Sequence, residues 1–489
     1  MKIINPSQKL PGVFYSYGCT KVLSLLCLLL ILSFSGIKAQ TYQASWESLD
    51  KRPIPAWFGA AKFGIFIHWG VYSVPAYRPL GKERYASYAE WYQVDVMNKP
   101  GPGRQFHDKN YGKDFTYRQF APLFKAELFD PNFWADIFKR SGARYVVLTS
   151  KHHDGYCLWP TKSPYSKNWN SVENGPGRDL VGEISNAVRA KGLKMGLYYS
   201  LLEWETNTKG AKEGSYYVDQ TAVETYRIPE DKYIDAHIMP QLKELVTNYK
   251  PAVIFSDGAW DHTSDYWKSK EFLSWLYNNA PNKDEVVVND RWGKDTHEKH
   301  GDYFTSEYAS NDDKMDASHP WEENQGVGGS YGYNRAENIE DYKTSKQLIH
   351  LLIDRVSRGG NLLLNVGPTA DGRIPELMQE RLLDIGNWLS VNGEAIYDTR
   401  AWKPASLNKD STVFFTEKNK SVYAICTKWP AKPLSVKGVS GKQLSVQLLE
   451  NKIPVKSVVK DGMLVIYPPV FSPEKINNAH AYVFKITGF

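Results

Sequence analysis

Residues 145–153 read Y-V-V-L-T-S-K-H-H, an apolar run that ends in a lysine and two histidines. A near-continuous apolar run of this length is typical of a strand buried on both faces of a parallel sheet. Six further segments follow the same plan, and most of them become polar at their C-terminal end. They are 64–70 (G-I-F-I-H-W-G), 194–200 (K-M-G-L-Y-Y-S), 252–258 (A-V-I-F-S-D-G), 286–291 (V-V-V-N-D-R), 303–308 (Y-F-T-S-E-Y) and 361–368 (N-L-L-L-N-V-G-P).

Helical patterns lie between several of these strands. Residues 179–191 place Leu180, Ile184 and Val188 on one face, and Gly192 follows as a C-terminal cap. Residues 231–248 and 376–391 have similar spacing. Strands that alternate with helices indicate an α/β fold with a parallel sheet. Seven such units over roughly 330 residues favour a (β/α)8-like barrel, which we place at residues 40–398.

The pattern changes after about residue 401, where the helical period disappears. Short strand patterns joined by turns follow, and Asp461-Gly462 is a tight hairpin signal. These strands are expected at 413–416, 422–427, 444–449, 463–467 and 482–486. Residues 399–489 therefore predict a C-terminal antiparallel β-sandwich.

The first 39 residues have the pattern of a cleaved signal peptide. A basic start is followed by an apolar run over 22–37 and by a cleavage point after Ala39. We therefore expect a secreted or periplasmic protein with no stable membrane insertion after cleavage; an uncleaved N-terminal anchor is the alternative. Four of the 60 Lys and Arg residues lie in this segment, so 56 remain against 54 acidic residues. This near balance gives no indication of a nucleic-acid partner.

Two of the four cysteines, Cys157 and Cys426, lie beyond the expected signal peptide. Two cysteines so far apart in sequence form neither a disulfide framework nor a zinc site. A single bridge between them is conceivable, but the two residues fall in different predicted domains.

Six of the predicted strands end in polar or ionisable residues. In a barrel, the C-terminal ends of the strands form one rim, and this rim carries the active site. The residues at these ends are His68, His152, His153, Tyr198, Tyr199, Asp257, Arg291 and Glu307. Any one of them could be a structural hydrogen-bonding residue, but repetition over six strands indicates a shared pocket.

Two of these rim residues are carboxylates, Asp257 and Glu307. A pair of carboxylates is what glycoside hydrolysis needs, because one attacks the anomeric carbon and the other protonates the leaving oxygen. The structural alternative for Asp257 is a cap on the following loop. His152 and His153 could also suggest a metal site, but no zinc-binding helix motif is present. We therefore expect no metal and no cofactor, with the imidazoles binding sugar hydroxyls.

The motifs resemble those of the α-L-fucosidases of glycoside hydrolase family 29. They run in order from about residue 45 to 395, and their concurrence is highly specific. The matching segments are 57–70 (W-F-x-x-A-K-F-G-I-F-I-H-W-G), 89–92 (A-E-W-Y), 151–155 (K-H-H-D-G), 196–200 (G-L-Y-Y-S), 256–258 (S-D-G), 288–293 (V-N-D-R-W-G), 321–322 (W-E), 330–335 (S-Y-G-Y-N-R) and 359–372 (G-G-N-L-L-L-N-V-G-P-x-x-D-G).

The resemblance implies an exo-acting, retaining α-L-fucosidase that works by double displacement on fucosylated oligosaccharides or glycoconjugates. Asp257 falls at the nucleophile position and Glu307 at the acid/base, with Glu322 as the rival and Glu323 as a weaker one. The substrate-binding positions fall on His68, Glu90, Trp91, His152, His153, Tyr199 and Arg291. We expect Phe255, Trp69 and Tyr331 to contact the methyl group of the sugar.

Two other functions remain open at this point. A non-catalytic fucose-binding module would keep the histidines and aromatics, but it would need neither carboxylate. A metallo-hydrolase would lose activity in a chelator. The sequence gives no indication of linkage preference, aglycone or oligomeric state.

Overall fold

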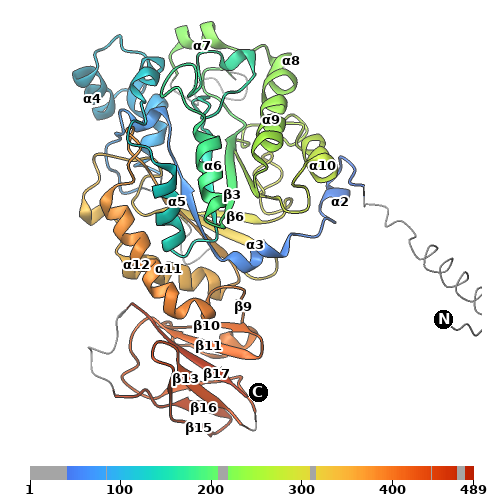
Figure 1. Ribbon diagram of the computed structural model, residues 1–489, viewed down its shortest axis with the longest axis vertical. Coiled ribbons are helices and arrows are strands. Elements are labelled where there is room, and N and C mark those ends of the chain that lie inside the picture. The colour runs from blue at the N-terminus through green and yellow to red at the C-terminus, as the bar shows by residue number, and fades with distance from the viewer. Residues whose placement is uncertain are drawn as a thin grey trace, which may run out of the picture. The chain divides into compact units, whose positions relative to one another are not determined.

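The computed structural model describes residues 41–83, 85–206, 218–308, 315–441, 443–470 and 480–488. The expected signal peptide at 1–39 lies outside the described residues. Eight parallel strands, one more than the apolar runs predict, form a curled half-barrel (Figure 1). They are β1 (Phe63–Ile67), β2 (Tyr145–Lys151), β3 (Lys194–Ser200), β4 (Val253–Asp257), β5 (Val287–Val288), β6 (Phe304–Glu307), β7 (Trp321–Gly326) and β8 (Asn361–Val366).

The strand order is β5-β4-β3-β2-β1-β8-β7-β6, so β1 pairs with β2 on one side and with β8 on the other. The two edge strands of this sheet are β5 and β6. The predicted (β/α)8-like architecture is confirmed in this curled form.

Helices alternate with the strands and lie along their outer side (Figure 1). The predicted helix at 179–191 is α6, where the Asp179 carboxylate accepts from the Gly182 amide at 2.9 Å and caps the first turn. The helices are α2 (Trp46–Leu49), α3 (Ala56–Ala61), α4 (Pro102–Asn110), α5 (Pro131–Arg140), α6 (Leu180–Ala190), α7 (Gln220–Tyr226), α8 (Glu230–Lys232), α9 (Met239–Tyr249), α10 (Ser269–Asn279), α11 (Ser345–Ser357) and α12 (Glu376–Asn392).

The strand that the sequence analysis missed is β7, which reads W-E-E-N-Q-G and is buried at every position. This strand gives no apolar signal because most of its residues are polar. Several of these side chains can nevertheless be buried because they form hydrogen bonds with other buried groups. Ser306 donates to Glu323 at 2.8 Å, for example, and Tyr331 donates to Asn324. A buried polar group that is hydrogen-bonded avoids most of the penalty of burial.

Aromatic side chains fill the interior of the barrel. Phe58, Tyr145 and Tyr303 pack together near the N-terminal ends of the strands, and the Phe58 and Tyr303 rings are 4.4 Å apart. Phe66 and Phe255 extend the same cluster toward the C-terminal ends of the strands, with ring centroids 5.1 Å apart. These aromatic rings fill the barrel beneath the C-terminal rim, so a ligand bound at the rim would contact aromatic side chains.

The C-terminal strands form two antiparallel sheets, as the sequence predicts. The orders are β14-β13-β17-β11-β10-β9 and β12-β16-β15. Asp461 and Gly462 both have positive φ and connect β15 to β16, as the hairpin signal indicates. The strands are β9 (Arg400–Ala401), β10 (Val413–Lys418), β11 (Ser421–Cys426), β12 (Leu434–Val436), β13 (Ser445–Leu448), β14 (Ile453–Pro454), β15 (Ser457–Lys460), β16 (Met463–Ile466) and β17 (Tyr482–Thr487).

The C-terminal sheets contact the barrel through its last helices. The Trp388 indole of α12 donates to the Ala481 carbonyl at 3.0 Å, and His350 of α11 donates to the His480 carbonyl at 2.8 Å. Cys157 and Cys426 are both buried and free, so the conceivable bridge between them is not formed.

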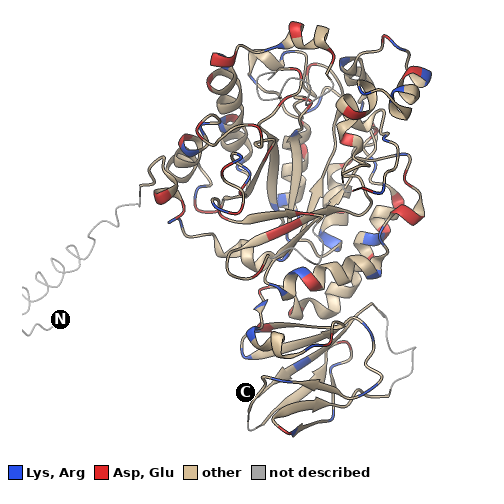
Figure 2. Cartoon of the chain, turned by 180° about the vertical axis from the view of Figure 1, so that it is seen from behind, with Lys and Arg blue, Asp and Glu red and all other residues tan. Residues whose placement is uncertain are grey.

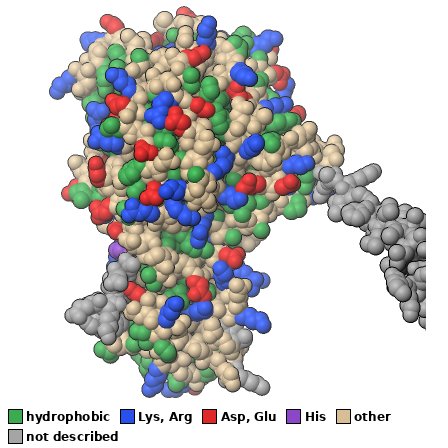
Figure 3. All heavy atoms as spheres, in the orientation of Figure 1, with side chains coloured by type: hydrophobic (Ala, Val, Ile, Leu, Met, Phe, Trp, Pro, Cys, Tyr) green, Lys and Arg blue, Asp and Glu red, His purple; other side chains and the backbone are tan. Residues whose placement is uncertain are grey.

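Charged side chains of both signs are interspersed along the chain (Figure 2) and over the face shown in Figure 3. No helix within the described ranges combines the length and apolar character that crossing a bilayer requires.

Candidate active site

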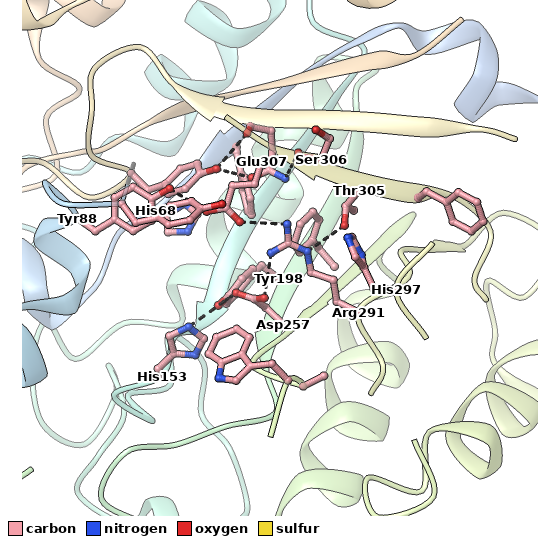
Figure 4. Close-up of a pocket in the computed structure, with 18 of the residues that line it drawn as sticks. His68, Tyr88, His153, Tyr198, Asp257, Arg291, His297, Thr305, Ser306 and Glu307 are labelled. Atoms are coloured by element: carbon pink, nitrogen blue, oxygen red, sulfur yellow. Dashed lines mark hydrogen bonds and ion pairs between the residues drawn. The ribbon is translucent and has the colours of Figure 1, made fainter. Parts of the chain in front are cut away.

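The C-terminal ends of the barrel strands surround a cavity of about 1180 Å³ (Figure 4). This volume exceeds the range of roughly 300–1,000 Å³ that is usual for small-ligand sites, so a sugar and part of its aglycone can enter. Eight of the predicted site residues line this cavity. They are His68, Glu90, Trp91, His152, His153, Asp257, Arg291 and Glu307.

Asp257 is the last residue of β4 and points into the cavity. Its Oδ2 accepts from the Tyr198 hydroxyl at 2.9 Å, and its Oδ1 accepts from Arg291 at 3.1 Å. Burial alone would raise the pKa of Asp257, but the charge of Arg291, the nearby His153 and the hydrogen bonds from Tyr198 and Arg291 together outweigh this effect and lower the pKa. Gly258 ends the strand with φ of 72°, where a Cβ would lie 2.9 Å from Ser200 Oγ. Asp257 is therefore an ionised carboxylate held in a fixed position.

Arg291 connects this carboxylate to a second one. Its Nη1 donates to Asp257 and its Nη2 donates to Glu307 Oε2, both at 3.1 Å (Figure 4). Its Nε donates to Thr305 Oγ1 at 3.0 Å, which fixes the plane of the guanidinium group. Because one planar group bridges both acids, residues fifty positions apart in the sequence face the same space.

Glu307 is the last residue of β6, and both of its carboxylate oxygens are hydrogen-bonded. Oε2 accepts from Arg291, and Oε1 accepts from the Tyr88 hydroxyl at 2.8 Å. Tyr88 is not among the predicted site residues, although it directly precedes the A-E-W-Y motif. Tyr198 lies at a predicted strand end but is likewise not among the predicted substrate-binding residues. Each of these two tyrosines donates to one of the two acids, Tyr88 to Glu307 and Tyr198 to Asp257.

Three histidines, His68, His152 and His153, also line the cavity. Burial lowers the pKa of His68 to about 3 and that of His153 to about 4, and it holds the pKa of His152 well below its usual range. The rings of His152 and His153 are 4.2 Å apart. All three are therefore neutral near pH 7 and can bind hydroxyl groups without adding charge.

Glu90 and Trp91 enter the cavity from a short 3₁₀ turn, Ala89–Trp91. The Glu90 carboxylate accepts from the Gly332 amide at 2.8 Å, and burial raises its pKa to about 7. The Ala89 amide donates to Ser330 Oγ at 2.9 Å. These bonds attach the turn to residues 330–332, so both segments present side chains to the cavity together.

The expectation for Tyr199 is corrected. Its hydroxyl donates to Gln241 of α9 at 2.8 Å, and its ring packs against Lys151, outside the cavity. Successive side chains of a strand point to opposite faces, so Tyr198 occupies the inner side instead. Tyr198 pairs in register with Phe255, and both line the cavity.

The rival acids lie elsewhere in the barrel. Glu322 pairs in register with Thr305, two residues before Glu307, and is fully buried below the cavity, where the Tyr145 hydroxyl donates to it. Glu323 faces away and accepts from Ser306. Neither of them lines the cavity, so Glu307 is the one of the three candidate acids that shares this space with Asp257.

The aromatic walls agree only in part with the expectation. Phe255 and Tyr331 line the cavity, together with Phe66. Trp69 does not line it. Its indole donates to the Thr369 carbonyl at 2.9 Å, and its ring packs among other aromatics beneath the surface.

Metal binding was the other reading of the histidine pair. Across the part of the chain that the structure describes, no three His, Cys, Asp or Glu side chains are close enough together to hold a metal ion. The His153 ring instead contacts Ser200 Oγ through Nδ1 at 2.6 Å, and its Nε2 lies 3.8 Å from the carboxylate oxygen Asp257 Oδ2.

Glu322→Gln is expected to change the pH dependence of stability while leaving the cavity intact. Burial raises the pKa of Glu322 to about 8, above its ordinary value of about 4.3. Between these values the unfolded chain is ionised while the folded chain keeps its proton, so stability falls as pH rises. The loss is at most about 1.4 kcal/mol per pH unit.

Glutamine cannot ionise, so the variant should escape this loss. Urea unfolding at pH 5 and pH 8 would measure it, with wild-type protein losing more stability than the variant over this interval. Equal losses in the two proteins would contradict a buried, protonated Glu322.

Two bridged carboxylates, three neutral imidazoles and aromatic walls at the rim of a (β/α) barrel form the kind of site that glycoside hydrolases use. The family comparisons agree with this class. Residues 29–394 match the α-L-fucosidase family model, and residues 408–487 match that of the α-L-fucosidase C-terminal domain. The chain belongs to the α-L-fucosidase family and is an enzyme of the glycoside hydrolase class.

Several α-L-fucosidases align with nearly the whole chain. The α-L-fucosidase of Dictyostelium discoideum is 42% identical over 488 residues, which cover 96% of this chain and 99% of the relative. The tissue α-L-fucosidase of Homo sapiens is 41% identical and covers 94% and 97%. The crystal structure of Thermotoga maritima α-fucosidase with a mechanism-based inhibitor has a TM-score of 0.77 at 37% identity, covering 91% of this chain and 100% of that one.

Proposed function

We propose that this protein hydrolyses terminal α-L-fucosyl groups from oligosaccharides or glycoconjugates with retention of configuration, by double displacement. The observation that carries the proposal is the guanidinium group of Arg291, which donates to Asp257 and to Glu307 at 3.1 Å each. Retention requires two carboxyl groups about 5–5.5 Å apart, whereas inversion requires about 6.5–9.5 Å to leave room for water. Acids that share one guanidinium group favour the closer arrangement.

In the first step, an oxygen of Asp257 forms a bond to C1 of the sugar while the bond from C1 to the leaving oxygen breaks. The electron pair of that bond goes to the leaving oxygen, which takes the proton of Glu307. Asp257 suits the nucleophilic role because its lowered pKa keeps it ionised. Phe255 and Tyr331 offer apolar surface for the methyl group of the sugar.

In the second step, water attacks C1 and the ester bond to Asp257 breaks. Glu307, now a carboxylate, takes a proton from this water. Arg291 remains beside both acids through the cycle, so it offsets whichever negative charge is present. This step returns both carboxyl groups to their starting states.

The stereochemistry of the product tests this mechanism directly. The ¹H NMR spectrum of an aryl α-L-fucoside during early hydrolysis should show α-L-fucose before mutarotation. Initial release of the β anomer would contradict double displacement. The absence of any turnover would favour the fucose-binding module instead. A chelator should leave the rate unchanged, whereas loss of activity would favour the metallo-hydrolase.

Tyr88→Phe is expected to lower kcat/KM for a fucoside with a poor leaving group by about tenfold or more. The Tyr88 hydroxyl donates to Glu307 Oε1 at 2.8 Å and helps to hold this carboxyl group in place. A hydrogen bond to a charged group contributes ~1.5–3 kcal/mol, and ~1.4 kcal/mol corresponds to a tenfold change in rate. Steady-state kinetics with such a fucoside would measure the loss. Tyr85→Phe, at the same cavity, is the matched control and should keep the wild-type rate.

We also propose that residues 1–39 are removed during export and that the mature protein is secreted or periplasmic. The basic start and the apolar run before Ala39 support this proposal. N-terminal sequencing of the protein recovered outside the cytoplasm should begin at Gln40. A recovered chain that begins at Met1 would support the uncleaved anchor.

A further inference from the structure

Two buried residues outside the predicted site contact the cavity histidines. Asn365, on β8, lies beside His68, and Ser200, at the end of β3, lies beside His153. Both contacts involve the Nδ1 atom of the imidazole, at 2.7 Å and 2.6 Å respectively. In a neutral imidazole one nitrogen donates and the other accepts, and the partner of the first nitrogen decides which is which.

The orientation of Asn365 is fixed from its far side. Its Nδ2 donates to the Tyr331 carbonyl at 2.7 Å, and a carbonyl oxygen accepts but never donates. The amide oxygen must therefore be the atom that faces His68. Because that oxygen can only accept, His68 must donate from Nδ1 and carry its proton there.

Ser200 leads to the same result for His153. Its single hydroxyl proton is donated to the Leu202 carbonyl, which is an acceptor only. The Ser200 oxygen is then free only to accept from His153, so the proton of that ring is also on Nδ1. The distance from His153 Nε2 to Asp257 Oδ2 agrees with this tautomer. At 3.8 Å it is beyond hydrogen-bond length, as expected when two acceptors face each other (Figure 4).

His152 lies between these two histidines and differs from them. Its Nδ1 is buried and has no hydrogen-bond partner within the described chain. A buried N–H without a partner is rarer in proteins than a buried acceptor without one. His152 is therefore expected to carry its proton on Nε2.

We propose that Asn365 and Ser200 are positioning residues that set the hydrogen-bond polarity of the sugar pocket. His68 and His153 present bare Nε2 acceptors to the cavity, whereas His152 presents an N–H donor. This inference rests on the proposed function: the two Nε2 atoms accept hydrogen bonds from two hydroxyl groups of fucose. A ligand that offers only oxygen lone pairs at those two places leaves both nitrogens unpaired, which disfavours ethers and esters at the same positions.

Nitrogen NMR of the whole protein labelled with ¹⁵N in its histidine rings tests this assignment. Long-range ¹H–¹⁵N spectra distinguish a protonated ring nitrogen from a bare one, and His68→Asn, His152→Asn and His153→Asn variants assign the signals. We expect the proton on Nδ1 in His68 and His153, and on Nε2 in His152. A proton on Nε2 in either His68 or His153 would overturn the proposal. The tautomers are measured in the wild-type enzyme, and the variants serve only to assign its signals.

Variants of the two positioning residues give a matched pair. Asn365→Ala should remove the Nδ1–H signature of His68 and leave that of His153, and Ser200→Ala should do the reverse. A general loss of packing would disturb both histidines together, so selective loss supports the proposal. An unchanged His153 tautomer in Ser200→Ala would overturn the role of Ser200.

Titration with L-fucose separates this inference from the proposed function. Binding should shift the Nε2 resonances of both His68 and His153, because each accepts a hydrogen. Shifts at other site residues without any at these two nitrogens would overturn the acceptor role alone. A spectrum that fucose leaves unchanged would count against the proposed function, while the tautomers read in the free protein would stand.

Discussion

Asp257→Ala is expected to lower turnover of an aryl α-L-fucoside by about ten-thousand-fold or more, which is typical when a residue that acts directly in bond formation is removed. Asp257 is an ionised acid at the end of a strand, and both of its oxygens are held by donors. Alanine removes the atom that would bond to C1, and water cannot replace it in that position. The fold should survive, because Arg291 keeps its contact with Glu307.

Azide would show which role has been lost. A small anion fits the space that Asp257 vacates, beside Arg291, and can attack C1 from the same side. The product should then be β-L-fucosyl azide, with inverted configuration and a partly restored rate. Ser256→Ala is the matched control on the same strand, since Ser256 is also buried and its side chain points to the opposite face of β4. Full activity in Asp257→Ala would remove Asp257 from the mechanism.

The rim of the barrel could be predicted because parallel strands give a strong signal. Six of the seven apolar runs end in polar residues, as in the V-I-F-S-D run that leads to Asp257. The helix at 179–191 and the Asp461-Gly462 hairpin were equally clear, because capping and turn residues act over a few positions.

Contacts between strands were not predictable in the same way. The family resemblance places a binding residue at Tyr199, and the sequence does not distinguish Tyr199 from Tyr198 until the register with β4 is known. In the structure Tyr198 pairs with Phe255, two residues before Asp257 and therefore on the same face. The register between strands depends on contacts between residues far apart in the chain, so it cannot be derived directly from a single sequence.

Strand β7 is absent from the predicted strands for a related reason. Burial of Glu322, Glu323 and Asn324 is possible only because partners on other strands satisfy them, among them Tyr145 and Ser306. Hydrophobic patterning responds to the apolar character of each residue and not to its partners. Tyr88 escaped notice similarly, since its role comes from one hydroxyl contact with Glu307 across 219 positions.

Glu307→Gln is expected to slow hydrolysis of fucosides with poor leaving groups far more than that of fucosides with good ones. General acid catalysis contributes typically 10²–10⁴-fold, so we expect losses of about this size with an oligosaccharide. An activated aryl fucoside needs little protonation as it leaves, so its first step should be almost unaffected. Rates over a series of aryl fucosides would show this as a steeper dependence on the acidity of the leaving group.

Glu322→Gln is the matched control, since it makes the same change at a buried acid outside the cavity. It should keep the wild-type dependence on the leaving group. Azide gives a second distinction, because the fucosyl-enzyme still forms on Asp257 in Glu307→Gln. Azide should then attack this intermediate and give α-L-fucosyl azide, opposite in configuration to the product of Asp257→Ala. If Glu322→Gln instead shows the steeper dependence, the proton comes from below the cavity, and the assignment of Glu307 is wrong.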